Sequence, residues 1–340
     1  MSPRYDFASD NTAPAAPEAM AALIAANAGF SASYGADATA ARAADLIRQM
    51  LDADADVRFV TSGTAANAIC LAALARPFEG VLAHRDSHVA TDETGAPGFF
   101  GHGLAIQGLE GASGRIDPQA LTRALAKPES AHAQPPAALS LTNATEYGTV
   151  YSAEALAVLT AAVRDRGYGV HLDGARLANA AATGFDLKSI PGLGVDLLVI
   201  GGTKAGMTPA EAIVIFRKDL VPRFDARLKQ AGQLPSKSRF YAAPFVGMFE
   251  SGAFITRAAH ANAMARRLAE LMPLPLRHPV EANGVFVEMD EPTLKRLQGA
   301  GWFVYRFIDG SVRFMCSWAT TMEAIETLID AVTVALEPTP

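Results

Sequence analysis

The chain has 340 residues, of which 29 are basic and 35 acidic, and its formal net charge at neutral pH is −6. Half of the residues are hydrophobic and 19% are charged, which excludes a disordered chain and predicts a globular protein of roughly two domains. The acidic balance and the lack of a basic run argue against nucleic acid as a partner, and no apolar stretch approaches the roughly 20 residues that span a membrane.

The two cysteines, Cys70 and Cys316, lie in apolar segments and are too few for a disulfide framework. The first residues, MSPRYDFASDNT, contain no apolar segment typical of a secretion signal. We therefore expect a cytoplasmic protein in a reducing compartment.

Over the first two thirds of the chain, short apolar runs alternate with segments of helical periodicity. This alternation predicts an α/β fold, with a mostly parallel central sheet and helices on both faces. The expected strands are 58–61, 80–84, 137–142, 169–173, 195–200 and 212–216. The expected helices between them are 64–75, 118–126 and 152–166.

The pattern changes after about Gly232. An alanine-rich helix is expected over 254–271, followed by the proline-rich break MPLPLRHP and then by strand, helix, strand and helix. We expect a large domain at 1–240 and a smaller α+β domain at 241–340.

Ligands of an open parallel sheet gather beyond the carboxyl ends of its strands, so the residues after each expected strand are candidates for chemistry. After the first strand, Ser62, Gly63 and Thr64 lead directly into a helix, and its free N–H groups with the two hydroxyls would suit a phosphate. The chain has no GxGxxG or P-loop motif, which disfavours a dinucleotide or a nucleoside triphosphate. The same three residues could instead form an ordinary helix N-cap.

A polar cluster follows the second expected strand. It consists of His84, Asp86, His88, Asp92 and Glu93. Neither HExxH nor CxxC accompanies it, so we expect no metal site. The alternatives are one functional imidazole at His88 and a solvated polar surface.

Two later strand ends carry opposite charges. Asp173 ends an apolar run, where a buried carboxylate is costly unless a cation meets it, and Lys204 follows another strand between glycines. The two residues are 31 positions apart, about one strand–crossover–strand unit, so neighbouring strands can present them to one crevice. In the alternative interpretation, Asp173 caps the next helix and Arg176 is its surface partner.

A phosphate-binding helix start, a buried carboxylate and a desolvated lysine match the needs of pyridoxal phosphate. The aldehyde of this cofactor forms a Schiff base with lysine, and its protonated ring nitrogen needs an anionic partner. We therefore predict pyridoxal phosphate as the cofactor.

Five segments of the chain resemble bacterial low-specificity L-threonine aldolases, which have the aspartate aminotransferase-like fold (fold type I). These segments are SGTAAN, HLDGAR, GGTKAGM, AHANAMARRL and VRFMCSW. The resemblance implies that the protein cleaves β-hydroxy-α-amino acids to glycine and an aldehyde. It also implies a homodimer or homotetramer whose active sites are completed across the interface, with residues 1–35 contributing to both.

The resemblance further implies roles around the cofactor. Lys204 would form the Schiff base, Asp173 would face the ring nitrogen, and His88 would stack on the ring. The residues expected to hold the phosphate are Ser62, Gly63, Thr64 and Thr203.

On the substrate side, the resemblance implies that Arg176 and Arg313 grip the carboxylate, with Arg176 also near the cofactor, and that Ser9 contacts the substrate. Glu146 lies where many relatives have a histidine near the β-hydroxyl. The resemblance therefore does not identify the group that accepts the hydroxyl proton.

Three residues are implied to reach a neighbouring subunit. Tyr34 lies in a segment similar to the family's YGDD, although Ala36 replaces its first acid. Lys229 and Lys237 lie in a segment that resembles a phosphate contact across the interface.

Other activities would use the same groups. A β-eliminating lyase or an aminotransferase shares the lysine, the aspartate and the arginines, and a non-catalytic protein could retain the pocket as a ligand sensor. We predict the aldolase.

Overall fold

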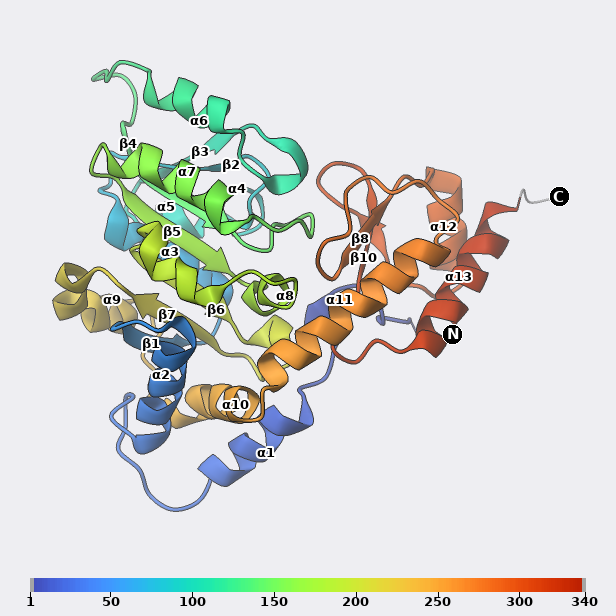
Figure 1. Cartoon of the computed structure of the whole chain (residues 1–340), viewed down its shortest axis with the longest axis horizontal. Coiled ribbons are helices and arrows are strands. Elements are labelled where there is room, and N and C mark those ends of the chain that lie inside the picture. The colour runs from blue at the N-terminus through green and yellow to red at the C-terminus, as the bar shows by residue number, and fades with distance from the viewer. Residues whose placement is uncertain (1–2, 338–340) are drawn as a thin grey trace.

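A seven-stranded sheet forms the centre of the larger part of the molecule, as the computed structural model of residues 3–337 shows (Figure 1). Its strands are β1 (Asp56–Val60), β2 (Gly80–His84), β3 (Ala105–Leu109), β4 (Pro136–Thr142), β5 (Gly169–Gly174), β6 (Leu197–Gly201) and β7 (Glu211–Ile215). The strand order is β1-β7-β6-β5-β4-β2-β3, and only β7 runs against its neighbours. The expected α/β fold with a mostly parallel sheet is confirmed.

Both faces of this sheet are covered, because alternate residues of its strands enter two different hydrophobic cores. In β6, Leu198 and Ile200 belong to one core, whereas Leu197 and Val199 belong to the other. The helices of this part are α1 (Pro17–Ala26), α2 (Ala38–Leu51), α3 (Gly63–Leu74), α4 (His88–Thr91), α5 (Ala96–Phe100), α6 (Pro118–Leu125), α7 (Ala153–Arg164), α8 (Leu177–Ala181), α9 (Phe224–Gln230) and α10 (Arg239–Glu250).

The helix starts follow the expected caps. The side chains of Ser62 and Ser152 accept hydrogen bonds from the backbone three residues ahead, and Asp117 accepts one from the backbone two residues ahead. Strand β3 is the one strand of the large sheet that the sequence did not predict. It lies at the edge of the sheet, and four of its five residues are half-buried or exposed, so it lacks a continuous apolar run.

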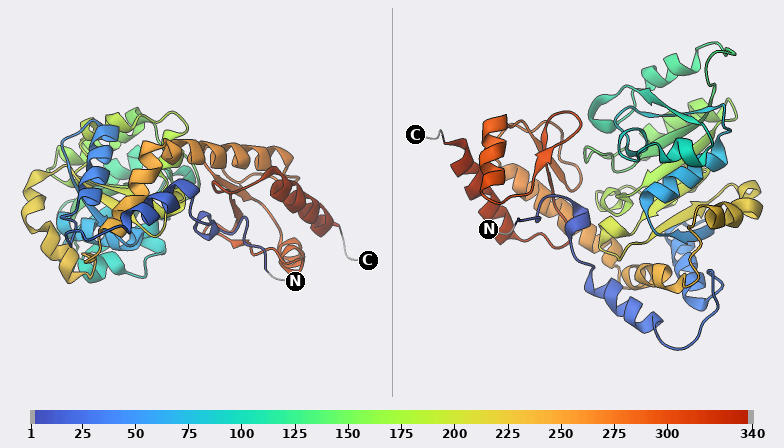
Figure 2. Two further views of the ribbon diagram at one scale, coloured as in Figure 1. Left: turned by 90° about the horizontal axis from the view of Figure 1, so that it is seen from below. Right: turned by 180° about the vertical axis from the view of Figure 1, so that it is seen from behind.

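The smaller part contains an antiparallel sheet of three strands. These strands are β8 (Gly284–Val287), β9 (Tyr305–Arg306) and β10 (Val312–Met315). Helices α12 (Glu291–Gly299) and α13 (Met322–Leu336) contribute to its core, and so does Phe7 from the N-terminal segment. Figure 2 shows the N-terminal segment lying beside this sheet.

The long helix α11 (Ala253–Leu271) joins the two parts, as both views of Figure 2 show. Its first turn, with Ala253 and Phe254, packs in the core of the large sheet, whereas Ala265 and Leu268 pack in the core of the small one. Among the helices of residues 3–337, none is both long and apolar enough to cross a membrane.

Candidate active site

A cavity of about 450 Å³ lies beyond the carboxyl ends of the central strands, where the small sheet faces the large one. Its walls come from the loops after β2, β4, β5 and β6, from the N-terminal segment and from the small sheet. The residues that the sequence predicted for the site and that line this cavity are Ser9, His88, Glu146, Arg176, Lys204 and Arg313.

Lys204 lies in a short turn after β6 that only glycines allow. A Cβ atom at Gly201 would lie 2.3 Å from a carbonyl oxygen of the loop after β5, and one at Gly202 would lie 2.4 Å from the Ala210 carbonyl oxygen. Gly206 has a φ of +94°, in the left-handed region. Burial lowers the pKa of Lys204, and the nearby charge of Arg176 lowers it further, which favours the neutral, nucleophilic amine.

Asp173 is the last residue but one of β5, next to the strand that leads to Lys204, and is 3% exposed. Its Oδ1 accepts a hydrogen bond from the Ala175 backbone at 2.9 Å, and its Oδ2 accepts one from Asn67 Nδ2 at 2.8 Å. Within the described chain no basic side chain forms an ion pair with this carboxylate, because Arg176 pairs with Asp10 instead. The alternative in which Arg176 serves Asp173 as a surface partner is therefore wrong, and the buried carboxylate remains suited to a cationic ligand.

A chain of hydrogen bonds runs from Asp173 to His88. Asn67 Nδ2 donates to Asp173 and also to Glu93 Oε1 at 2.8 Å, and Glu93 Oε1 lies 2.9 Å from His88 Nδ1. The hydrogen bond to Glu93 raises the pKa of His88 in spite of the opposing effect of burial. Asn67, on α3, was missed in the sequence because nothing near it marks a polar partner, whereas Glu93 was part of the polar cluster.

Glu146 lies in the loop after β4, next to the backbone of His88 on α4. Its Oε1 accepts hydrogen bonds from the His88 backbone at 2.9 Å and from Thr142 Oγ1 at 3.1 Å. Its Oε2 is buried and has no partner among the described residues. Burial raises the pKa of Glu146, so this carboxyl is poised to take up a proton.

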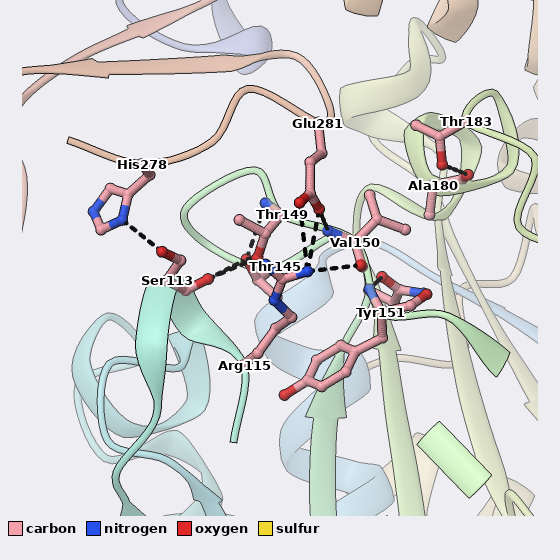
Figure 3. A network of polar contacts seen from close by, with 11 residues as sticks. Ser113, Arg115, Thr145, Thr149, Val150, Tyr151, Ala180, Thr183, His278 and Glu281 are labelled. Carbon is pink, nitrogen blue, oxygen red and sulfur yellow. Dashed lines mark hydrogen bonds and ion pairs between the residues drawn. The ribbon is translucent and has the colours of Figure 1, made fainter. Parts of the chain in front are cut away.

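Figure 3 shows hydrogen bonds that anchor residues 145–150 of the loop after β4, which also carries Glu146. Thr145 and Thr149 donate hydrogen bonds to the Ser113 carbonyl oxygen at 3.1 and 2.7 Å. From the smaller part of the chain, Glu281 accepts a hydrogen bond from the Val150 backbone at 2.6 Å. Glu281 also lies 3.4 Å from Nη1 of Arg115, which itself donates to the Val150 carbonyl oxygen.

The start of α3 has the geometry expected of a phosphate site. Ser62 caps the helix through Ala65, and a Cβ atom at Gly63 would meet nothing within 4 Å, so the space in front of the helix start is open. The backbone N–H groups of Gly63 and Thr64 have no carbonyl partner inside the helix.

Thr203 has its hydroxyl engaged within the protein. The hydroxyl donates to Glu211 Oε1 at 2.8 Å and accepts from the Ala210 backbone at 3.3 Å. Glu211 Oε2 also accepts from the Gly202 backbone at 2.8 Å, and burial raises the pKa of Glu211 to about 7. The role of Thr203 at the phosphate stays a prediction, and the sequence missed Glu211 because it lies within an apolar strand.

The two predicted arginines, Arg176 and Arg313, both line the cavity. Arg313, on β10, lies over the rings of Tyr305 and Phe307, at 5.2 and 4.8 Å from their centroids, and hydrogen-bonds the Tyr305 hydroxyl. Its buried Nε has no partner within residues 3–337. Ser9 lies in the cavity wall, where its hydroxyl accepts a hydrogen bond from the Asn11 backbone at 3.2 Å.

Eight of the predicted residues do not line this cavity, and they are Tyr34, Ser62, Gly63, Thr64, Asp173, Thr203, Lys229 and Lys237. Tyr34 lines a second cavity of about 370 Å³ and donates its backbone N–H to the Ser236 carbonyl oxygen. Lys229 Nζ lies 4.6 Å from the centroid of the Tyr34 ring. Lys237 follows Ser236 directly, and none of these three residues lines the cavity that contains Lys204.

Metal ligands do not gather anywhere in the described part of the chain. No group of three or more histidine, cysteine, aspartate or glutamate side chains within residues 3–337 is placed to hold an ion. In the polar cluster, His88 turns to Glu93, while His84 contacts the Gly111 carbonyl oxygen and the Asp86 backbone.

Comparisons with known proteins match nearly the whole chain. Residues 6–292 match the model of the beta-eliminating lyase family. The chain is 44% identical to a low specificity L-threonine aldolase of Pseudomonas aeruginosa, over 95% of both chains. It is 43% identical to a low specificity L-threonine aldolase of Pseudomonas sp., over 92% of this chain and 93% of the relative.

Solved structures agree with this result. A threonine aldolase of Leishmania major superimposes with a TM-score of 0.90 at 29% identity, covering 97% of this chain and 99% of that one. A tryptophan decarboxylase of Catharanthus roseus superimposes with a TM-score of 0.78 at 13% identity, covering 97% of this chain and 82% of that one. The second match concerns the fold alone.

Proposed function

The chain belongs to the beta-eliminating lyase family, and on that basis we propose that it is a pyridoxal-phosphate-dependent aldolase. It cleaves L-threonine, L-allo-threonine and related β-hydroxy-α-amino acids to glycine and an aldehyde. The observation that carries this proposal is that Asp173, on β5, and Lys204, in the turn after the neighbouring parallel strand β6, lie at the same end of the sheet.

The residues present fit pyridoxal phosphate. The buried Asp173 carboxylate, without a basic partner in the described chain, suits a protonated ring nitrogen, and the amine of Lys204 suits a Schiff base with the aldehyde. His88 would lie on the ring, and the open N-terminus of α3 would take the phosphate. When bound, the cofactor supplies an electron sink for the electrons that the Cα–Cβ bond releases.

The arginines orient the amino acid. Arg176 and Arg313 line the same cavity and would bind the substrate carboxylate, which restricts rotation of the substrate about its other bonds. With the carboxylate held, fewer orientations of the bond to the β-carbon would remain open to the substrate beside a bound cofactor.

Glu146 is the residue that we assign to the proton of the β-hydroxyl. Its Oε1 is held by the His88 backbone and Thr142, which leaves Oε2 to accept the proton. A raised pKa makes this carboxylate a stronger base than an exposed glutamate. Removal of the hydroxyl proton lets the aldehyde form as the Cα–Cβ bond breaks.

A neighbouring subunit completes the site in this proposal. Tyr34, Lys229 and Lys237 lie together but outside the cavity of their own subunit, so they would serve a neighbour's cavity in a homodimer or homotetramer. Exposed apolar side chains nearby in the sequence, Ile24 and Phe30, support such an interface. The two cysteines are free and buried, which supports a reducing compartment such as the cytoplasm.

The decisive experiment distinguishes aldol cleavage from β-elimination and transamination by the products that are formed. The cofactor-loaded protein is incubated with L-threonine, and acetaldehyde, glycine and keto acid are measured. We expect acetaldehyde and glycine in equal amounts. Keto acid without acetaldehyde would instead indicate a β-eliminating lyase or an aminotransferase, and a protein that binds the cofactor without making any product would be a sensor.

A substrate panel then defines the preference at both carbons. L-Threonine, L-allo-threonine and β-phenylserine report on the β-carbon, and their D-enantiomers serve as controls for Cα. Cleavage of the L-series alone is the expected result.

A further inference from the structure

A buried ion pair stands at the substrate end of the cavity. Asp10 Oδ2 lies 2.6 Å from Arg176 Nε, and Asp10 Oδ1 lies 2.9 Å from Arg176 Nη2. The side chains of Asp10 and Arg176 are 0% and 10% exposed. The carboxylate therefore occupies one whole edge of the planar guanidinium, which fixes its plane and not only its position.

The bidentate contact leaves a defined part of Arg176 unused. Within residues 3–337, Nη1 of Arg176 makes no hydrogen bond, and the residue lines the cavity. Nη1 and the second hydrogen of Nη2 form another fork on the outer edge of the guanidinium. That fork has the geometry that a second carboxylate requires.

Asp10 is itself held by the smaller part of the chain. Asn283 Nδ2 donates to Asp10 Oδ2 at 3.1 Å and to the Cys316 carbonyl oxygen at 2.8 Å. The N-terminal segment, the loop after β5 and the end of β10 thus meet at one carboxylate. Burial alone would raise the pKa of Asp10, but Arg176, supported by Lys204 and Asn283, brings it down to about 2, so the carboxyl is ionised at any working pH.

The charge balance explains why an anion is needed there. Arg176, Arg313 and Lys204 all line the cavity, and the charge of Arg176 adds to burial in lowering the pKa of both Arg313 and Lys204. Asp10 offsets this repulsion without occupying the face of Arg176 that a ligand would use. Because buried ion pairs contribute little net stability, orientation of Arg176 is a better account of this one than stability.

We propose that Asp10 is a positioning residue for substrate recognition, which holds Arg176 so that its outer fork binds the carboxylate of the amino acid. This inference rests on the proposed function, because it needs an amino acid in the cavity. It assigns a role to the N-terminal segment in addition to that of Ser9, and Asp10 acts through Arg176 without touching the substrate.

The test compares two ligands that differ only in the carboxylate. Glycine and glycinamide are titrated into the cofactor-loaded wild-type and Asp10→Asn proteins, and binding is followed by the change in cofactor absorbance. We expect the Kd of glycine to rise about 10- to 100-fold in Asp10→Asn, as for loss of a charge-assisted contact, while the Kd of glycinamide changes less than about threefold.

A double-mutant cycle isolates the route through Arg176. In an Arg176→Met background, where the guanidinium is gone, Asp10→Asn should change the Kd of glycine by no more than about twofold. Asp6→Asn is the matched control, because Asp6 lies in the same segment but is partly exposed and pairs only with Arg4 at 3.5 Å. That control should bind both ligands as the wild type does.

Several results would overturn the role of Asp10. Equal weakening of glycine and glycinamide, or additive effects of the two substitutions, would show a general structural effect. Thermal unfolding of the cofactor-free variants measures that effect directly. If Asp10→Asn does not fold, Asp10→Glu retains the charge but displaces it, and an unchanged Kd for glycine in that variant would contradict the proposal. A wild-type protein that does not respond to glycine at all would overturn the proposed function itself.

Discussion

The two ends of the cavity are built in different ways. At one end, Lys204 lines the cavity after β6, and the neighbouring strand β5 carries Asp173, whose hydrogen bonds connect side chains of the larger part. The end with Arg176 and Arg313 is assembled from the N-terminal segment, a loop of the large sheet and a strand of the small sheet. One end comes from adjacent strands of one sheet, whereas the other is formed by three segments that are far apart in the sequence.

This difference suggests that the two ends of the cavity have different functions. Groups that must hold their place throughout a reaction lie where the backbone of the sheet holds them, and groups that bind the variable substrate lie where separate segments join. Substitutions at the first end should therefore reduce the rate or the cofactor affinity, and those at the second end should mainly weaken amino-acid binding. The predictions below test this contrast.

The largest effect is expected at Lys204. Lys204→Ala removes the amine that we propose forms the Schiff base, so turnover of L-threonine should fall at least about 1,000-fold, and the absorbance of the linked cofactor should disappear. Lys295→Ala is the control, since Lys295 is largely exposed and lies 3.9 Å from Glu291. Retention of the absorbance in Lys204→Ala would show that another lysine binds the cofactor.

The second largest effect on turnover is expected for a substitution of Asp173. Asp173→Asn removes the charge that we propose faces the ring nitrogen, and we expect a loss of about 10²- to 10³-fold in turnover, with weaker cofactor binding measured by fluorescence. Asp196→Asn is a matched control, because Asp196 is also buried but pairs with Arg164 and Arg217 away from the cavity. Asp196→Asn should lower the unfolding temperature without changing cofactor affinity. Equal cofactor affinity in both variants would place Asp173 away from the ring.

Glu146→Gln tests the assigned proton acceptor. We expect the rate to fall roughly 10²-fold, because an amide cannot take the hydroxyl proton. In the wild type the pKa of Glu146 is raised by burial, so its carboxylate form is lost as the pH falls through that raised pKa, and the rate should fall with it. The pH–rate profile should lose this acidic limb in Glu146→Gln. A retained limb would assign it to another group.

Glu211 gives a prediction about stability at the lysine end. Its pKa is raised from 4.5 to about 7, so the folded protein holds a proton that the unfolded chain releases. The free energy of unfolding should therefore decline as the pH rises from 4.5 to 7. Glu211→Gln should remove this decline. Relative to the wild type, the free energy of unfolding of the variant should therefore be higher at pH 8 than at pH 5, by on the order of 2 kcal/mol. Denaturant unfolding at the two pH values measures this, and parallel pH dependence of the two proteins would contradict it.

The smallest effect is expected where the small sheet supports the loop of Glu146. Glu281→Gln weakens the partly exposed contact with Arg115 and the Val150 backbone, and should lower turnover about two- to fivefold. Glu288→Gln is the control, because Glu288 pairs with Arg277 at 3.0 Å on the surface of the same part. A loss as large as that of Glu146→Gln would mean that the small sheet determines the geometry of the base.

Much of the first end was predictable from local sequence. The apolar runs before Asp173 and Lys204 identified β5 and β6, and a parallel sheet brings their carboxyl ends together. The cap at Ser62 identified the start of α3. Strand β3 escaped prediction because an edge strand needs no continuous apolar run, and the division of the chain at residue 240 stays a prediction.

The second end was predictable only through the resemblance to a family. Asp10 and Arg176 are 166 residues apart, so no spacing rule connects them. The resemblance placed Arg176 at the substrate, but it did not show which side of the guanidinium is free.

The sequence alone determined the α/β class, the positions of the main strands and the residues that follow them, because hydrophobic periodicity and helix capping are local properties of the chain. Only the tertiary structure decided which polar groups share a partner. It paired Asp10 with Arg176 and connected Asp173 to Glu93 through Asn67. It also placed the Glu211 carboxylate where it accepts a hydrogen bond from the Thr203 hydroxyl. The physical reason is that buried charges and hydrogen-bonding groups must be satisfied by whatever lies next to them in space, however far apart they are along the chain.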